Sequence, residues 1–284
     1  MDILILRKLY KFNSLFGSMK YKKSVSLLDL KKQNEVLLKS LRKLTKDKKN
    51  LEEQNVELIS VASHEMKTPL TSITSIVQLI FEGKMGKISE KQKENLGIAL
   101  HDARRLNVII KNMLDVSKIE EGRVIYKFES VDLRNLITES LKTAKQMLKE
   151  KKISVKVDCK GPLKMVADGY RIEQVILNLM TNAIKYGKVG GHIWITAKRK
   201  KGKILLAVKD DGKGMSEQNV LKLFRKGFQV ERTERVLMGL GYGLYISRKI
   251  LDRHKGKIWV ETKLGKGSTF FVSLNPELSG KKLK

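Results

Sequence analysis

A leucine recurs at every seventh residue from Leu30 to Leu58, and this repeat restricts the fold more than any other feature of the sequence. Such a repeat lays one apolar stripe along a helix and winds two helices around each other. Polar residues at half-heptad positions weaken the seam but fix its register; they are Asn34, Lys48 and Asn55. The pattern predicts a parallel two-helix coiled coil over residues 26–57, and therefore a homodimer. An amphipathic helix packed on the body of the chain is the alternative.

A helical hairpin is expected between residues 58 and 122. The helical pattern continues beyond the leucine repeat to glycines at 83 and 86, and its predicted buried stripe is Ile59, Ala62, Leu70, Ile73 and Val77. Ser89 and Gln92 have the spacing of a capping box. Apolar residues from Leu96 to Met113 then predict a second helix that ends near Gly122. Two such hairpins in a dimer close a four-helix bundle.

Beyond Gly122, short strands and helices alternate, which is typical of a two-layer α/β sandwich. The expected strands are 153–157, 193–197, 204–209, 258–262 and 269–274, and the expected helices are 133–150, 171–186, 219–224 and 242–253. We expect this domain to span 123–275 and the tail 276–284 to be disordered. The expected fold class is therefore α plus α/β.

The chain of 284 residues carries a formal net charge of +29, which attracts polyanions of any kind. Residues 1–60 hold 14 Lys or Arg against 7 Asp or Glu, so the surplus is spread along the chain rather than collected in one segment. It is carried mainly by Lys, whereas base readout favours the planar guanidinium of Arg. The charge therefore argues for a Lys-rich solvated surface and against specific nucleic-acid binding.

The cellular location is predicted from the cysteine content and from the apolar runs. Cys159 is the single cysteine, which excludes an internal disulfide and a multi-cysteine zinc site. No run approaches the ~20 apolar residues that a membrane span needs, so a cytoplasmic protein is expected. The first 25 residues combine apolar and aromatic side chains with six Lys or Arg and one Asp. That composition is typical of a helix lying at the inner membrane face, the alternative being a basic N-terminus packed on a partner.

His64 is the first residue with a chemical role to consider. A lone histidine on a helix is usually a surface or packing residue, but His64 lies opposite the predicted buried stripe and therefore faces solvent. Glu65 places a carboxylate beside it, Thr68 shares its face, and Pro69 disturbs the helix one turn later. These features fit a nucleophile that must meet two different partners.

Downstream, polar and glycine motifs occur at the ends of expected elements. Asn178 and Asn182 are four residues apart on one helix face, where amide oxygens can hold Mg²⁺ and phosphate groups. The segment Asp210-Asp211-Gly212-Lys213-Gly214 follows a strand, and Gly239-Leu240-Gly241-Tyr242-Gly243 opens a helix, where backbone amides can approach phosphates. Each motif alone is weak, and each has an ordinary interpretation as a turn or as surface polarity.

Together these motifs carry a family resemblance. In chain order they are His64-Glu65-x-x-Thr68-Pro69, Asn178-x-x-x-Asn182-Ala183-x-Lys185, Asp210-x-Gly212-x-Gly214, Phe224-x-x-x-Phe228, Gly239-x-Gly241-x-Gly243 and Gly265-x-Gly267-Ser268-x-Phe270. The series resembles the two-component sensor histidine kinases, from about Leu58 to Leu274. The resemblance implies a dimerisation and phosphoacceptor domain at 58–122, followed by an ATP-binding domain of the Bergerat type.

The resemblance also assigns roles to single residues. It implies that Asp210 recognises adenine, that Asn178 and Asn182 position Mg²⁺, and that Lys185 and Tyr186 contact phosphates or ribose. The other implied ATP contacts are Gly212, Gly214, Phe224, Gly239, Leu240, Gly241, Gly243, Leu244, Ser268 and Thr269. Residues 216–238 would form a mobile lid, with Phe224 and Phe228 packing it against the bundle. Leu240 and Tyr242 depart from the family pattern, which usually has a hydroxyl residue and a leucine there.

The implied activity is autophosphorylation of His64 by Mg·ATP, followed by phosphotransfer to an aspartate of a response regulator. Glu65 would act as the general base beside the histidine, and Thr68 would orient water for dephosphorylation of the regulator. One alternative is an ATPase or protein-serine kinase that lacks the histidine step. The other is a basic scaffold that binds membrane or nucleic acid through residues 1–60.

Overall fold

A computed structural model of the chain describes residues 27–161, 163–230 and 241–277. The chain divides into two compact units, Met1–Gln54 and Asn55–Lys284. Several expectations concern residues outside the described ranges. They are the interfacial segment 1–25, lid residues 231–238, Gly239, Leu240 and the tail beyond residue 277.

Helix α2, Leu27–Phe81, begins in the first unit and continues into the second without a break at Pro69. The five leucines of the heptad repeat are all exposed in the single chain, from 49% at Leu30 to 68% at Leu58. The helix predicted over 26–57 is therefore present, and its leucine stripe has no cover within the described chain. Among the described residues, no helix is long and apolar enough to cross a bilayer.

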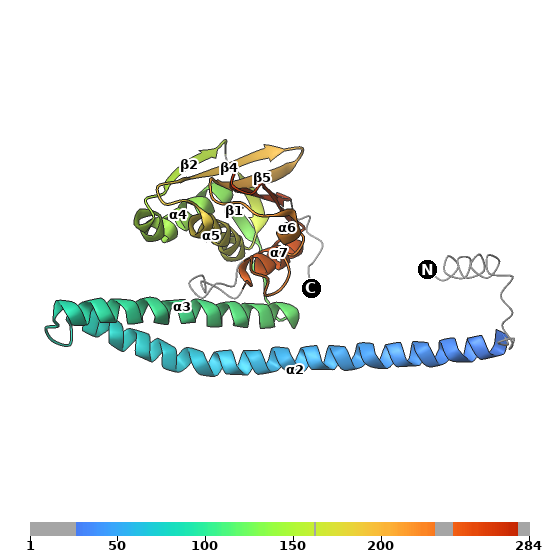
Figure 1. Cartoon of the computed structure of the whole chain (residues 1–284). Helices are drawn as coiled ribbons and strands as arrows, with labels where there is room; N and C mark the ends of the chain where they lie inside the picture. Colours follow the sequence, from blue (N-terminus) through green and yellow to red (C-terminus); the bar gives the residue numbers. More distant parts are fainter. Residues whose placement is uncertain (1–26, 162, 231–240, 278–284) are drawn as a thin grey trace. The chain divides into compact units, whose positions relative to one another are not determined.

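Helix α3, Glu90–Glu120, returns antiparallel to the second part of α2 and forms the predicted hairpin (Figure 1). Ser89 caps it through the predicted box, since its hydroxyl accepts from the Gln92 amide and Gln92 Oε1 accepts from the Ser89 amide. Contacts at both ends fix the register. The Ser117 hydroxyl donates to the Val56 carbonyl at 3.2 Å, and Arg104 donates to Gln78 Oε1 at 2.8 Å.

The predicted buried stripe of α2 is only partly correct for a single chain. Leu70 is buried, Ile59 and Val77 are half-buried, but Ala62 and Ile73 are exposed. Ser63, which was not predicted, is buried instead. The α2 face that packs on α3 is rotated from the predicted stripe, so part of that stripe is left uncovered.

The α/β domain has a five-stranded sheet in the order β2-β4-β5-β7-β6. Its strands are β2 Ser154–Cys159, β4 His192–Lys200, β5 Lys203–Asp210, β6 Lys257–Thr262 and β7 Ser268–Leu274. Strands β2 and β4 are parallel and the other pairs are antiparallel. The helices are α4 Leu133–Glu150, α5 Gly169–Tyr186, α6 Glu217–Val220 and α7 Gly243–Arg253. Figure 1 shows α4, α5 and α7 on one side of the sheet, and this confirms the expected fold class.

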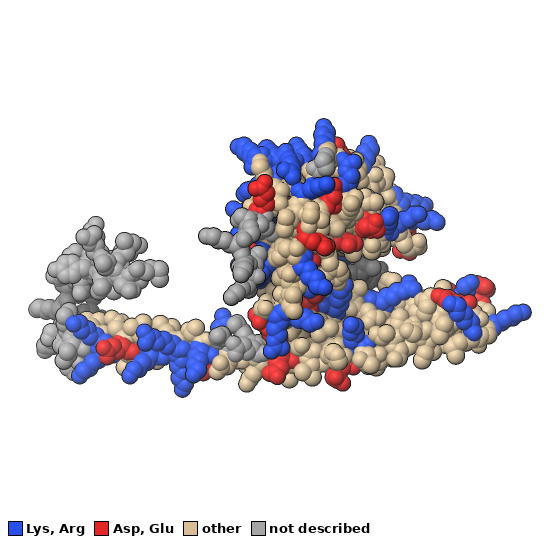
Figure 2. Space-filling view, turned by 180° about the vertical axis from the view of Figure 1, so that it is seen from behind, with Lys and Arg blue, Asp and Glu red and all other residues tan. Residues whose placement is uncertain are grey.

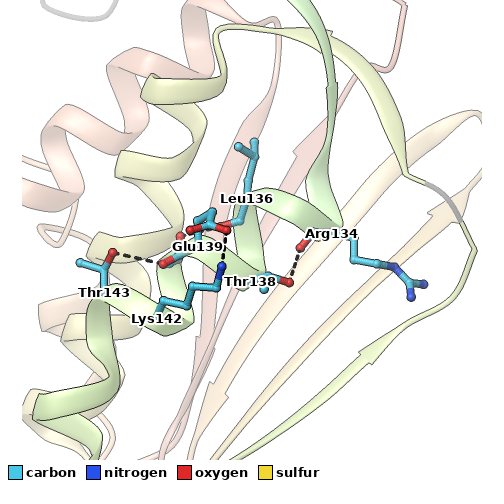
Figure 3. A network of polar contacts seen from close by, with 7 residues as sticks. Arg134, Leu136, Thr138, Glu139, Lys142 and Thr143 are labelled. Atoms are coloured by element: carbon cyan, nitrogen blue, oxygen red, sulfur yellow. Dashed lines mark hydrogen bonds and ion pairs between the residues drawn. The ribbon is translucent and has the colours of Figure 1, made fainter.

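Helix α4 illustrates why these segments become helical. Its apolar side packs in the core through Leu133, Ile137 and Ala144, which are 1% exposed or less. On the other side, Thr138 and Thr143 donate to carbonyls four residues back, and Lys142 pairs with Glu139 at 2.8 Å (Figure 3). The helix therefore presents a polar face to solvent and an apolar face to the sheet.

Two short strands were not predicted. Strand β1, Glu129–Asp132, pairs antiparallel with β3, Lys164–Ala167, to form a second sheet. The expectation of a disordered tail from residue 276 is wrong for Pro276. That residue is buried, and its carbonyl accepts the Val166 amide of β3 at 3.1 Å.

Candidate functional site

A pocket lies between α5, the ends of β5 and β7, and the start of α7. Most of the residues predicted to contact nucleotide line it, and they are Asn178, Asn182, Lys185, Tyr186, Asp210, Gly214, Gly241, Gly243, Leu244 and Ser268. These residues come from four separate stretches of sequence. The fold therefore collects motifs that the sequence leaves up to 90 residues apart, from Asn178 to Ser268.

Asp210 ends strand β5 and is the buried acid of the pocket, 3% exposed. Its Oδ1 accepts the Gly212 amide at 2.9 Å and the Ser268 amide at 3.3 Å. Burial raises the pKa of this carboxyl, and the two amide donors oppose that rise. A fixed, buried carboxyl of this kind can recognise a hydrogen-bond donor on a ligand.

Asn178 and Asn182 project from the same side of α5 into the pocket. The Asn178 amide nitrogen donates to the Ser247 hydroxyl of α7 at 2.9 Å, which fixes how this side chain is turned. Its Oδ1 lies against Gly243, where an added Cβ would collide with it. Because residue 243 is a glycine, the start of α7 leaves room for this amide oxygen at the pocket wall.

Cations gather around Tyr186 at the end of α5. The Lys185 ammonium lies 4.9 Å from the Tyr186 ring centroid, and that of Lys213 lies 5.6 Å from it. Lys151 donates to the carbonyls of Ile184 and Lys185 at 2.8 Å and so caps this helix end. The pocket mouth is thus positively charged and suits an anionic ligand.

The loop after β5 needs a glycine at 214. Gly214 has φ of +65°, and a Cβ there would collide with the Lys263 carbonyl. Because of both constraints, any other residue at position 214 would strain the backbone. The glycine therefore lets the loop pack against the β6–β7 turn, and the loop forms this wall of the pocket.

Three predicted contact residues lie elsewhere. Gly212 stands behind Asp210, against the Tyr186 carbonyl. Phe224 is half-buried and packs against the α/β core, whereas Phe228 lines the pocket. Thr269 does not line it, because neighbouring strand residues point to opposite faces and Ser268 takes the inner position.

Two pocket residues come from the hairpin and were not predicted. Val108 and Asn112, on α3, line the pocket opposite the residues of α5. Their placement depends on docking of α3 onto the α/β domain, where Asp115 and Arg171 form an ion pair at 3.0 Å. The local sequence carries no signal for such a contact.

His64 lies on α2 with 78% of its side chain exposed, as predicted. Its Nδ1 is 3.5 Å from the Glu65 carboxylate, and Thr68 is exposed one turn away. After Pro69, the hydroxyls of Thr71 and Thr74 donate to carbonyls four residues back, at 2.8 and 2.7 Å. The helix next to His64 therefore lacks the backbone donor at Pro69, but it continues as an α-helix through this turn.

Sequence families match both parts of this arrangement. Residues 54–122 match the His Kinase A (phospho-acceptor) domain, and residues 167–278 match the histidine kinase-, DNA gyrase B-, and HSP90-like ATPases. The two matches occur in the order that the motifs predict and together cover most of the chain. The chain belongs to the sensor histidine kinases.

Curated relatives of this histidine kinase are longer proteins. It is 29% identical over 221 residues to the circadian input-output histidine kinase CikA of Synechococcus elongatus, covering 76% of this chain and 29% of CikA. It is 30% identical over 235 residues to Drug sensory protein A of Synechocystis, covering 79% of this chain and 35% of that protein. The chain thus spans about a third of the length of these relatives.

A solved structure shares the arrangement. The kinase aligns with the histidine kinase ThkA, crystallised in complex with the response regulator protein TrrA, at a TM-score of 0.53 and 27% identity. The alignment covers 75% of this chain and 61% of that one. The likeness thus includes both the hairpin and the α/β domain.

Proposed function

We propose that this kinase binds Mg·ATP in the α/β pocket, phosphorylates its own His64 and passes the phosphoryl group to an aspartate of a response regulator. The observation that carries the proposal is the buried Asp210 carboxyl, held by two backbone amides in the same pocket as Asn178 and Asn182. The pocket thus pairs one hydrogen-bond acceptor at its inner end with amides and cations at its mouth. That polarity matches a purine nucleotide with its phosphates outward.

Asp210 is the residue proposed to recognise adenine. Its two hydrogen bonds both fall on Oδ1, so Oδ2 remains for the exocyclic amino group of adenine. Guanine presents a carbonyl at that position, which a carboxylate would repel. The site is therefore proposed to select adenine over guanine.

The phosphate end fits Mg²⁺ only together with nucleotide. Asn178 and Asn182 offer neutral amide oxygens, and no group of three His, Cys, Asp or Glu able to hold a metal occurs in the described ranges. Such a weak donor set suits an ion that keeps phosphate and water ligands. The ion would neutralise phosphate charge during transfer. Lys185 and Lys213 would add positive charge at the same end.

His64 is the proposed nucleophile. Glu65 faces Nδ1, which favours the tautomer with the proton on Nδ1 and leaves Nε2 with its lone pair in solvent. Nε2 would form a bond to the γ-phosphorus while the bond to the bridging oxygen breaks and ADP leaves. The Glu65 carboxylate would stabilise the positive charge that develops on the ring. The product, phosphohistidine, is labile enough for transfer to an aspartate.

The test is labelling of the full chain with γ-³²P ATP and Mg²⁺. His64→Gln should abolish the label, which should be acid-labile in the unchanged protein. His101→Gln is a matched control, because His101 on α3 is also exposed and its Nδ1 lies 3.4 Å from Asp102. Label that survives in His64→Gln, or that is acid-stable, would contradict the histidine kinase step and point to a serine kinase.

A phosphatase activity toward the regulator is proposed for Thr68. Its hydroxyl is exposed near His64, where it can orient a water molecule at the phosphorylated aspartate of a docked receiver. Thr68→Ala should retain autophosphorylation and lose regulator dephosphorylation. Thr71→Ala is the control, because that hydroxyl is committed to the Lys67 carbonyl. Phosphotransfer to the host's receiver proteins would identify the cognate regulator.

The working unit is proposed to be a homodimer. The heptad leucines Leu30, Leu37, Leu44 and Leu51 are exposed, and Ile73 and Ile76 of α2 are 55% and 52% exposed. A second copy would bury both stripes, in a coiled coil and in a four-helix bundle over 58–122. Leu44→Lys should raise the dimer dissociation constant in sedimentation equilibrium, whereas Lys43→Ala, beside the stripe, should not.

A further inference from the structure

The five-stranded sheet has one face covered by helices and one that they leave open (Figure 1). On β5, Ile204, Leu206 and Val208 are buried toward the helices, so the residues between them point the other way. The strand registers place the outward residues of all five strands on one surface, here called the outer sheet face. It consists of Ser154, Lys156, Asp158, His192, Trp194, Thr196, Lys198, Lys200, Lys203, Leu205, Ala207, Lys209, Lys257, Trp259, Glu261, Thr269, Phe271 and Ser273.

Both tryptophans of the chain lie on the outer sheet face. Trp259 is 36% exposed and stacks on Phe271, with ring centroids 5.2 Å apart. Trp194 stacks on His192 at 5.6 Å, and the Lys209 ammonium lies 5.2 Å from its ring centroid. Trp194 is half-buried, so both rings are partly covered by their neighbours while one side of each remains on the open face of the sheet.

The charge of the outer sheet face is strongly positive. It has six lysines, at 156, 198, 200, 203, 209 and 257, against the carboxylates of Asp158 and Glu261. The two carboxylates stand on the edge strands β2 and β6, so the central strands carry none on this face. Figure 2 shows Lys and Arg gathered along the upper margin of the α/β domain, where Figure 1 places β2, β4 and β5.

We propose that the outer sheet face docks on an anionic phospholipid surface. Tryptophan prefers the membrane interface because its ring is apolar and its N–H is polar, and lysines are attracted to anionic headgroups. The face offers two tryptophans among six lysines, a broad surface rather than a pocket. The proposal does not depend on kinase activity.

Two other occupants fit less well. Single-stranded nucleic acid binds by stacking bases on open aromatic faces, but here the rings are stacked on Phe271 and His192. The one arginine of the β4–β5 hairpin, Arg199, points away from this face and donates to the Lys164 carbonyl at 2.9 Å. Protein interfaces are depleted in lysine at their centre, whereas Lys209 stands on the central strand of this sheet.

Docking would leave the nucleotide pocket open. Asp210, Ser268 and Phe270 line the pocket from the inner face, while their neighbours Lys209, Thr269 and Phe271 belong to the outer one. The sheet thus separates the two surfaces. A membrane-bound chain could still exchange nucleotide.

The chain's own tryptophans give a selective test. Residues 1–25 contain no tryptophan, so intrinsic tryptophan emission reports the outer sheet face and not the N-terminal segment. The full chain is mixed with vesicles of phosphatidylcholine, with or without phosphatidylglycerol. We expect a blue shift, and quenching by brominated acyl chains, with the anionic vesicles alone. Added salt should reverse both effects.

Charge reversal provides the matched variants. Lys156→Glu with Lys198→Glu should abolish quenching and weaken vesicle binding by about 25-fold or more, since each lysine near an anionic surface contributes about fivefold. Lys145→Glu with Lys149→Glu, on the exposed side of α4, makes the same charge change elsewhere and should leave quenching intact. ATP binding by both variants checks that they are folded.

Three results would overturn the proposal. Vesicle binding without a change in tryptophan emission would place the membrane contact elsewhere in the chain. An equal loss of vesicle binding in both double variants would show that binding responds only to the net charge of the chain. Quenching by a single-stranded oligonucleotide at lower concentration than by anionic vesicles would make the face a nucleic-acid surface.

Discussion

Asp115 on α3 and Arg171 on α5 form an ion pair whose Nη1–Oδ1 distance is 3.0 Å and whose side chains are only 11% and 14% exposed. Gln174 completes the contact by donating to the second Asp115 oxygen at 2.7 Å. Close by, Glu120 accepts from Lys226 at 2.7 Å and from the Tyr245 hydroxyl at 3.0 Å. The end of α3 is thus held to the α/β domain by two clusters of charge-assisted hydrogen bonds.

The first prediction concerns this docking contact. Asp115→Ala leaves the Arg171 guanidinium largely buried without its carboxylate, so stability should fall by about 2–3 kcal/mol. Amide hydrogen exchange in α3 from residue 110 to 120 should rise at the same time. Lys84→Ala is the control, since its pair with Glu82 at 2.6 Å is exposed to solvent and should contribute little to stability. Equal effects of the two variants would show that the Asp115 contact contributes no more than a surface pair.

The second prediction concerns Asp210, whose pKa is raised by burial. An acid with a raised folded-state pKa stabilises the fold most at low pH and loses that contribution as pH rises through this pKa. At neutral pH the charged Asp210 carboxylate therefore destabilises the folded chain. Asp210→Asn should raise the melting temperature of the nucleotide-free chain at neutral pH, and it should remove the fall in stability that occurs as pH rises from 3.8, the ordinary pKa of this carboxyl, through its raised pKa in the folded chain.

The same change should weaken ATP binding. An asparagine that keeps its oxygen on the Gly212 and Ser268 amides must turn its NH₂ group toward adenine, which brings two donors together. Affinity should fall about a hundredfold. Calorimetry of ATP binding and thermal unfolding, measured on one preparation, would check both effects. Lower stability together with unchanged affinity would contradict the proposed role of Asp210.

Much of the fold follows from local signals in the sequence. Strands β4, β6 and β7 show the alternation of less and more exposed residues that is typical of a strand with one covered face, whereas edge strand β2 has no buried residue. Helices α4 and α3 begin at the capping residues Asp132 and Ser89. The missed strands β1 and β3 have four residues each, and their register joins Glu129 to Ala167. Such a short pair is stabilised by its distant partner and carries no local period.

The residues of the pocket could be predicted from the sequence about as far as the strands and helices could. Motifs indicated Asp210 and Asn178, because their chemistry lies in residue type and spacing. They did not separate Ser268 from Thr269, since a shift of one residue reverses the face of a strand. Nor did they indicate Val108 and Asn112, whose place in the pocket wall depends on how α3 docks.

The third prediction concerns pH and the buried His254. Its Nε2 accepts the Asp168 amide at 3.0 Å, its Nδ1 lies 2.8 Å from the Ile250 carbonyl, and its ring packs on Phe128. Burial lowers the pKa of His254. The unfolded chain therefore binds a proton more readily than the folded one.

Stability should consequently fall as pH drops below about 6.5, the usual pKa of histidine, and the fall should level off below the folded-state pKa. His254→Gln keeps an acceptor for the Asp168 amide but does not titrate, so its melting temperature should decline less between pH 7.5 and 5.5. His192→Gln, at a side chain 50% exposed, is the control and should follow the unchanged chain. Parallel decline in all three proteins would assign the acid sensitivity to other groups.

The fourth prediction contrasts two glycines. At Gly243, an added Cβ would meet the Asn178 amide oxygen at the pocket wall, whereas at Gly97 on α3 it would lie 3.6 Å from Phe81 in ordinary contact. Gly243→Ala should therefore displace Asn178 and weaken Mg·ATP binding about tenfold or more. Gly97→Ala should leave nucleotide binding unchanged and stabilise the chain by about 0.5–1 kcal/mol, because alanine has the higher helix propensity. Titration with ATP in the presence and absence of Mg²⁺ separates the effects further, since displacing Asn178 should cost affinity mainly when the ion is present. A Gly243→Ala chain with unaltered magnesium dependence would remove Asn178 from the proposed ion site.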